Sequence, residues 1–84
     1  MPYSLKIKGS ALKELESLSA ADRARVVAAI DGLKRSPLAG TLLKGQHTGL
    51  RRIRVGSFRI IYEVRNEELV ILVLRVGHRR EIYR

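Results

Sequence analysis

The chain has 84 residues, the size of one small domain, and its 17 lysines and arginines against 8 aspartates and glutamates give a formal net charge of +9. It contains no cysteine, which excludes a disulfide framework and a thiolate metal site. Its two histidines lack a carboxylate at ligand spacing, so we expect no metal and no cofactor. We see neither a signal-peptide core nor an apolar run of about 18 residues, and we expect a cytoplasmic protein without a membrane segment.

The positive charge is concentrated in the second half of the chain. Residues 44–84 contain ten lysines and arginines and four acids, a surplus of six, against a surplus of three in residues 1–43. Nine of those ten are arginine, whose rigid guanidinium matches a phosphate at two points and stays charged. A basic surface that serves only solubility would mix both signs and use more lysine. The distribution favours nucleic acid as partner over a plain solvated surface.

The first part of the chain predicts a strand and a helical hairpin. Apolar residues alternate over Tyr3–Ile7, which is typical of a half-buried strand. After Gly9, Ser10 is placed to cap a short helix with apolar residues at helical spacing up to Leu18. A second helix follows, because residues 19–22 have the serine and acid spacing of a capping box, and we expect it to stop before Ser36-Pro37.

The second part predicts a loop and three strands. Residues 38–49 contain three glycines and no period, which indicates a loop. Leu50–Val55 and Phe58–Val64 flank Gly56-Ser57, a connection that suits a type II′ hairpin turn. Leu69–Val76 is almost wholly apolar and is expected to be a central strand. Residues 1–84 are therefore predicted to form a single α+β domain, an antiparallel four-stranded sheet packed against an N-terminal two-helix hairpin in the order β-α-α-β-β-β.

The predicted hairpin places arginines together. Around a two-residue turn at 56–57, residues whose numbers sum to 113 face each other, so Arg54 faces Arg59 and Arg52 faces Ile61. Like charges directly opposite each other are destabilising, which a stability-only account does not explain. The period of two puts Arg52 and Arg54 on the same face as Arg59, with Ile61 either reducing the polarity of that face or stacking against a base.

The alternative is a solvated face on which these arginines pair with Glu63 or Glu81. Two carboxylates cannot neutralise three strand arginines together with Arg79 and Arg80, so we favour a phosphate site. His78 follows the central strand, and its ordinary pKa of about 6.5 suits proton transfer near neutrality, although a lone histidine is more often structural. Tyr83 is a candidate to stack on a base or to move a proton, or it covers the edge of the core.

From Tyr3 to Tyr83 the chain resembles a RelE-type toxin of the RelE/ParE superfamily. The resemblance rests on the turn Leu43–Gly45, the runs Leu50–Val55 and Phe58–Val64, and the ending Val76–Arg79 with Tyr83. It implies the toxin half of a type II toxin–antitoxin pair, a ribosome-dependent mRNA endonuclease, or mRNA interferase, that enters the ribosomal A site, cuts the exposed codon and inhibits translation. It also implies a RelB-like antitoxin, and a net charge of +9 makes an acidic, largely disordered partner the expected one.

The resemblance further implies roles for individual residues. Arg59 and Arg79 match arginines that hold the scissile phosphate, and Tyr83 matches a tyrosine that orients a base or the nucleophile. Arg52 and Arg54 stand where the family has two strand lysines, and Lys44 matches a basic residue near ribosomal RNA. With these we group Arg51 and Arg80 as RNA-binding residues.

The presence of arginine at positions 52 and 54, where the family has lysine, bears on the mechanism. Attack by the ribose 2′-hydroxyl needs a base, cations for the charge that grows on phosphorus, and an acid for the leaving 5′-oxygen, but no metal. Arginine, with a pKa above about 12, supplies only the cation, so His78 becomes the candidate base or acid and Tyr83 the second choice. Two rival readings remain: a ParE-like inhibitor of DNA gyrase that cuts no RNA, and an RNA-binding module without catalysis.

Overall fold

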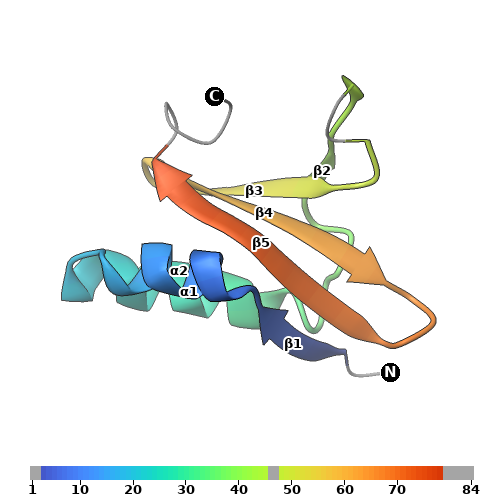
Figure 1. Ribbon diagram of the computed structural model, residues 1–84, viewed down its shortest axis with the longest axis horizontal. Coiled ribbons are helices and arrows are strands. Elements are labelled where there is room, and N and C mark those ends of the chain that lie inside the picture. The colour runs from blue at the N-terminus through green and yellow to red at the C-terminus, as the bar shows by residue number, and fades with distance from the viewer. Residues whose placement is uncertain (1–2, 46–47, 79–84) are drawn as a thin grey trace.

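A computed structural model describes residues 3–45 and 48–78 of the chain. Within these ranges the protein has two layers, with two helices on one face of a single sheet (Figure 1). The helices are α1 (Gly9–Glu16) and α2 (Ala20–Gly32). The strands are β1 (Ser4–Ile7), β2 (Thr41–Leu42), β3 (Arg51–Val55), β4 (Phe58–Arg65) and β5 (Val70–His78).

The order of the strands across the sheet is β1-β5-β4-β3-β2. The prediction of an α+β domain with a helical hairpin on one face is confirmed, but the prediction of four antiparallel strands is wrong in two respects. β1 runs parallel to β5, which is possible because the whole segment from α1 to β4 serves as the long connection that parallel neighbours need. A fifth strand, β2, lies in the predicted loop and pairs with β3 through Thr41 and Leu42; two residues are too few to show an alternating pattern.

At the helix N-termini, a side-chain cap is present on α2 and absent from α1. At the start of α2 the backbone N–H of Asp22 donates to Ser19 Oγ at 3.2 Å, which confirms the predicted cap. α1 begins at Gly9 with Lys8 as its capping residue and no side-chain cap, so the prediction that Ser10 caps this helix is wrong. Neither helix in the described part of the chain is long and apolar enough to cross a membrane.

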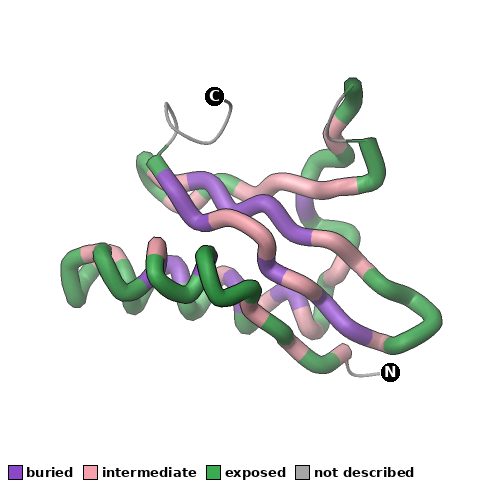
Figure 2. Tube along the Cα trace, in the orientation of Figure 1, coloured by how far each residue is buried: buried purple, intermediate pink, exposed green. Residues whose placement is uncertain are grey.

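The main hydrophobic core lies between the helices and the sheet. Figure 2 shows buried residues along β4 and β5 and on the helices beneath them. The buried members of the core are Ala11, Leu15, Val26, Ile30, Ile60, Val73 and Val76. Burial of these apolar groups is the dominant stabilising term, and it fixes which face of each strand points to the helices.

A second cluster is organised around Tyr62, a fully buried residue of β4. Its hydroxyl donates to the carbonyl of Pro37 at 2.8 Å and accepts from the N–H of Gly40 at 2.9 Å. Arg51 Nη1 donates to the carbonyl of Gly40 at 2.8 Å. These bonds fasten the segment between α2 and β2 to the sheet, and they explain why a chain without helical or strand periodicity has a fixed path there.

We expect Tyr62→Phe to lower the free energy of unfolding by about 1–3 kcal/mol, because the buried N–H of Gly40 loses its acceptor and the Pro37 carbonyl loses a donor. Urea denaturation measures this loss. The matched control is Tyr3→Phe, which removes an exposed bond to Asn66 and should change stability by less than about 0.5 kcal/mol. Equal losses in the two variants would contradict the role given to Tyr62.

The same tyrosine predicts a pH dependence. Burial raises the pKa of Tyr62 above its ordinary value of about 10, partly opposed by the hydrogen bond from Gly40 and by the charge of Arg51. The unfolded chain therefore loses this proton first as pH rises, so the stabilisation is complete below about pH 10 and declines above it. The free energy of unfolding, measured by urea denaturation at several pH values across that range, should fall less steeply with pH for Tyr62→Phe than for the wild type.

Gly40 has no room for a side chain. A Cβ at this position would lie 2.7 Å from the carbonyl oxygen of Arg52 and 2.7 Å from the hydroxyl of Tyr62. We expect Gly40→Ala to cost about 1–3 kcal/mol of stability through overpacking. Gly32→Ala is the control, since a Cβ there meets nothing within 4 Å, and it should leave the urea midpoint unchanged or raise it.

Candidate nucleic-acid interface

The turn between β3 and β4 sets the geometry of the site. Gly56 has φ of +58°, as the first central residue of a type II′ turn requires, whereas Ser57 is not in the positive-φ region. The pairing across the turn is Val55 with Phe58, Arg54 with Arg59, Ile53 with Ile60 and Arg52 with Ile61. The register predicted from the two-residue turn is confirmed.

This register separates cations from core residues. Ile53 and Val55 pack against the core between the sheet and the helices, so the residues between and beside them, Arg54 and Arg52, lie on the opposite face. Arg59 shares that face because directly paired residues project to the same side. We call the set Arg52, Arg54 and Arg59 the arginine face.

The three guanidinium-bearing residues differ in exposure. Arg54 is exposed and Arg52 is half-buried, whereas only 8% of the surface of Arg59 is exposed. A cation in such enclosed surroundings interacts with a nearby charge more strongly than one in open water. Ile61, on the same side, is 2% exposed, so it belongs to the interior and not to an open surface that would stack against a base.

The acid proposed to neutralise this face is engaged elsewhere. Glu63 Oε1 pairs with Arg65 Nε at 2.6 Å, two positions along the same strand and toward its far end. The other acid considered, Glu81, lies outside the described residues. The mutual repulsion of Arg54 and Arg59, directly paired across the strands, is therefore not relieved by Glu63.

Two further predicted RNA-binding residues lie in different surroundings. Arg51 is paired with Tyr62, on the helix side of the sheet, and bonds to the Gly40 carbonyl, so the structure does not bring it to the arginine face. Lys44 is exposed, and the segment that contains it, residues 43–45, rises on the side of the sheet away from the helices (Figure 1).

His78 lies on the other side of the sheet from Arg59. It is paired with Phe58, which packs against the core, and the two rings meet edge to face with centroids 5.8 Å apart. With Phe58 it lines a pocket of about 260 Å³ whose other residues are Glu14, Ser17, Leu18, Val76 and Gly77. His78 therefore does not lie on the arginine face. The remaining predicted residues, Arg79, Arg80 and Tyr83, lie outside the described residues.

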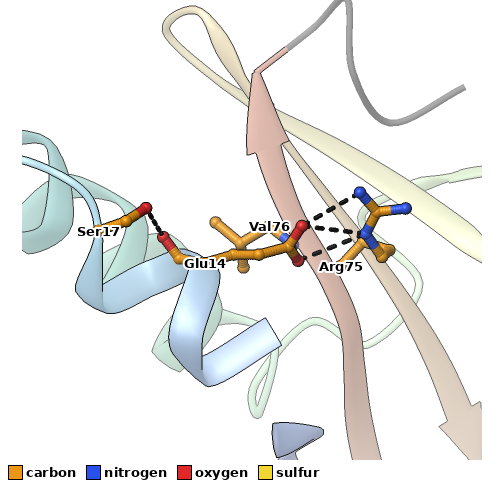
Figure 3. A network of polar contacts seen from close by, with 4 residues as sticks. All are labelled: Glu14, Ser17, Arg75 and Val76. Atoms are coloured by element: carbon orange, nitrogen blue, oxygen red, sulfur yellow. Dashed lines mark hydrogen bonds and ion pairs between the residues drawn. The ribbon is translucent and has the colours of Figure 1, made fainter. Parts of the chain in front are cut away.

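The sequence interpretation missed a polar network at the end of β5. Glu14 of α1 accepts a hydrogen bond from the N–H of Val76 at 3.0 Å and pairs with Arg75 Nη2 at 3.1 Å (Figure 3). The available signal was an acid in the last turn of a helix, where the macrodipole favours a base. Among residues 3–45 and 48–78, no group of three or more histidines, aspartates or glutamates is placed to hold a metal ion.

We expect Arg54→Gln to raise stability at low ionic strength by up to about 1 kcal/mol, because it removes the repulsion with Arg59. The gain should shrink as salt screens the charges. Urea denaturation at low and high salt measures both effects. Arg65→Gln is the control on the next strand, where loss of the pair with Glu63 should give no gain at either salt concentration.

Comparison with known proteins agrees with this geometry. The family model described as ParE toxin of type II toxin-antitoxin system, parDE, matches residues 5–83. Toxin RelG of Mycobacterium tuberculosis is 35% identical over 86 aligned positions, covering 100% of this chain and 99% of the relative.

Solved structures give the same result. The RelBE2 toxin–antitoxin complex of M. tuberculosis contains a chain with a TM-score of 0.87 and 32% identity, covering 94% of this chain and 100% of that chain. The RelE–RelB complex of Pyrococcus horikoshii OT3 matches with a TM-score of 0.79 and 32% identity over 96% of this chain and 99% of that chain. The isolated Escherichia coli RelE toxin matches with a TM-score of 0.78 and 28% identity over 96% and 90%. The chain therefore belongs to the RelE/ParE superfamily of type II toxin–antitoxin toxins.

Proposed function

We propose that this toxin is an mRNA interferase that cleaves mRNA in the ribosomal A site and thereby inhibits translation. The observation that carries the proposal is the arginine face, in which Arg54 and Arg59 are paired directly across two strands despite their like charge. Two guanidinium groups on directly paired residues can bind one anion together, and the phosphates of RNA are anions of the right size for two guanidinium groups. The likeness to RelE toxins supports the same activity.

The proposed reaction is an internal transfer at phosphorus. The 2′-oxygen loses its proton and attacks the adjacent phosphorus, the bond from phosphorus to the 5′-oxygen breaks, and that oxygen takes up a proton. Arg59 and Arg79 would hold the scissile phosphate and stabilise the charge that grows on its oxygens. Lys44, Arg52, Arg54 and Arg80 would bind flanking phosphates, whereas the bond from Arg51 to Gly40 supports a structural role for Arg51.

The proton transfers need groups other than arginine, whose pKa is above about 12. His78 and Tyr83 are the proposed candidates. Because His78 is paired with Phe58 on the helix side, its imidazole would reach a phosphate held by Arg59 only around the end of β5. We therefore propose that His78 contributes less than Arg59 and that Tyr83 orients the base or the nucleophile.

An acidic RelB-like antitoxin is the proposed partner that restrains the toxin. A net charge of +9 provides the attraction for such a partner. Two of the similar solved structures are RelB–RelE-type complexes of toxin with antitoxin. The proposed place of action is the cytoplasm, where translating ribosomes are found.

A second candidate function is inhibition of DNA gyrase without RNA cleavage, which is favoured by the match to the ParE toxin model. A gyrase inhibitor needs no phosphate pocket, so the arginine face argues for the nuclease. A non-catalytic RNA-binding module is the third candidate. It would be supported if the wild type binds RNA without cleaving it and Arg59→Ala loses this binding.

We expect primer extension on mRNA programmed into ribosomes to show cuts inside the A-site codon when the toxin is added. Arg59→Ala should reduce the cleavage rate about 10²–10³-fold, the effect of removing one group that stabilises transition-state charge. His78→Ala should reduce it less, because His78 lies on the other face of the sheet.

The controls for this experiment are a ribosome-free lane and Arg65→Gln, which changes an arginine at the far end of β4. Absence of cuts in every lane would refute the nuclease and call for a gyrase supercoiling assay. A larger loss for His78→Ala than for Arg59→Ala would refute the ranking of the two residues.

A further inference from the structure

The last part of β5 lacks a strand neighbour on one side. β1 pairs with β5 only from Val70 to Val73, and after Ile7 the chain turns away into α1. The next backbone donor on that edge is satisfied by a side chain: the N–H of Val76 donates to Glu14 Oε1 at 3.0 Å (Figure 3). Glu14 therefore takes the place of the missing strand at this point.

The same carboxylate makes a second contact with β5. Arg75 approaches Glu14 Oε2 through Nη2 at 3.1 Å and Nε at 3.2 Å, so two neighbouring residues of the strand are held by one side chain. Ser17 donates to the backbone carbonyl of Glu14 and closes the end of the helix. An acid in the last turn of a helix opposes the helix dipole, so the local structure of α1 does not account for Glu14, and the contacts with β5 do.

The residues that Glu14 contacts come immediately after an irregularity in the sheet. Ile61 pairs with Arg75 and Tyr62 pairs with Val73, so Leu74 is an extra residue that bulges out of the β4–β5 pairing. Beyond the bulge, Gly77 lies opposite Arg59 and His78 lies opposite Phe58. If the pairing of this short segment slipped by one position, each of its side chains would move to the other face of the sheet. A residue with a side chain would then lie opposite Arg59, in place of Gly77.

We propose that Glu14 is a positioning residue of the phosphate site: by holding Val76 and Arg75 it fixes the register of the end of β5, which sets the surroundings of Arg59. This inference rests on the proposed function for its effect on cleavage, but its structural part stands without it. The contacts of Glu14 with β5 are to Val76 and Arg75, and the proposed effect on Arg59 acts through this strand.

The structural part is tested by NMR of the whole chain. We expect Glu14→Ala to accelerate hydrogen exchange of the Val76 amide and of the amides of Ile60 and Ile61 in β4. We also expect it to weaken the NOEs between Arg59 and Gly77. Glu14→Gln retains an acceptor for Val76 and should restore most of the wild-type pattern. Glu16→Gln, on the same helix, changes an exposed acid and should change none of these signals. Unaltered exchange and NOEs in Glu14→Ala would overturn the inference.

The functional part is tested by the ribosomal cleavage assay with equal amounts of folded protein. We expect Glu14→Ala to lower kcat between tenfold and about a hundredfold with little change in KM, since a small displacement of a group that acts in the transition state has effects of that size. Glu14→Gln should recover most of kcat. Equal kcat in Glu14→Ala and wild type overturns the inference. If the wild-type protein itself does not cleave mRNA, the proposed function is refuted, and the NMR comparison alone then decides the role of Glu14.

Discussion

The register between β3 and β4 is the constraint on which the rest of the structure depends. Gly56 accepts the positive φ that a tight turn needs, and this single conformation decides which residues of the two strands face each other. Ile53 and Val55 then pack against the core on the helix side of the sheet, so Arg52 and Arg54, which alternate with them, project to the opposite face. The packing of the core and the arginine face are thus both consequences of the same turn.

Neighbouring arginines of one strand have different roles for the same reason. Arg51 projects to the helix side, where it bonds to Gly40 and stands near the hydroxyl of Tyr62. Arg52 projects to the other side and joins the arginine face. Charge alone does not distinguish these two residues, and the alternation of the strand does. The positive face of this protein is therefore smaller and more defined than its net charge suggests.

Local signals in the sequence predicted much of the fold. The turn at Gly56, the register around it, the cap at Ser19 and the helical hairpin each depend on residues close together in the chain. The parallel pairing of β1 with β5 was not predictable in the same way, because it depends on which edge of the sheet remains open. The arginine cluster followed from alternation, whereas the enclosure of Arg59 and the contact of Glu14 with Val76 depend on packing between distant segments.

The pairing of β1 with β5 also has a consequence for the order of events during synthesis. Ser4–Ile7 is made before the other strands of the sheet, yet its partner residues, Val70–Val73, are among the last of the described chain to be made. Until then the first strand has no neighbour with which to bond, while the contacts among β3, β4 and β5 are close in sequence and form at lower entropic cost. The pairing of β1 must therefore wait until β5 has been made, and until then β1 is a strand with both edges open.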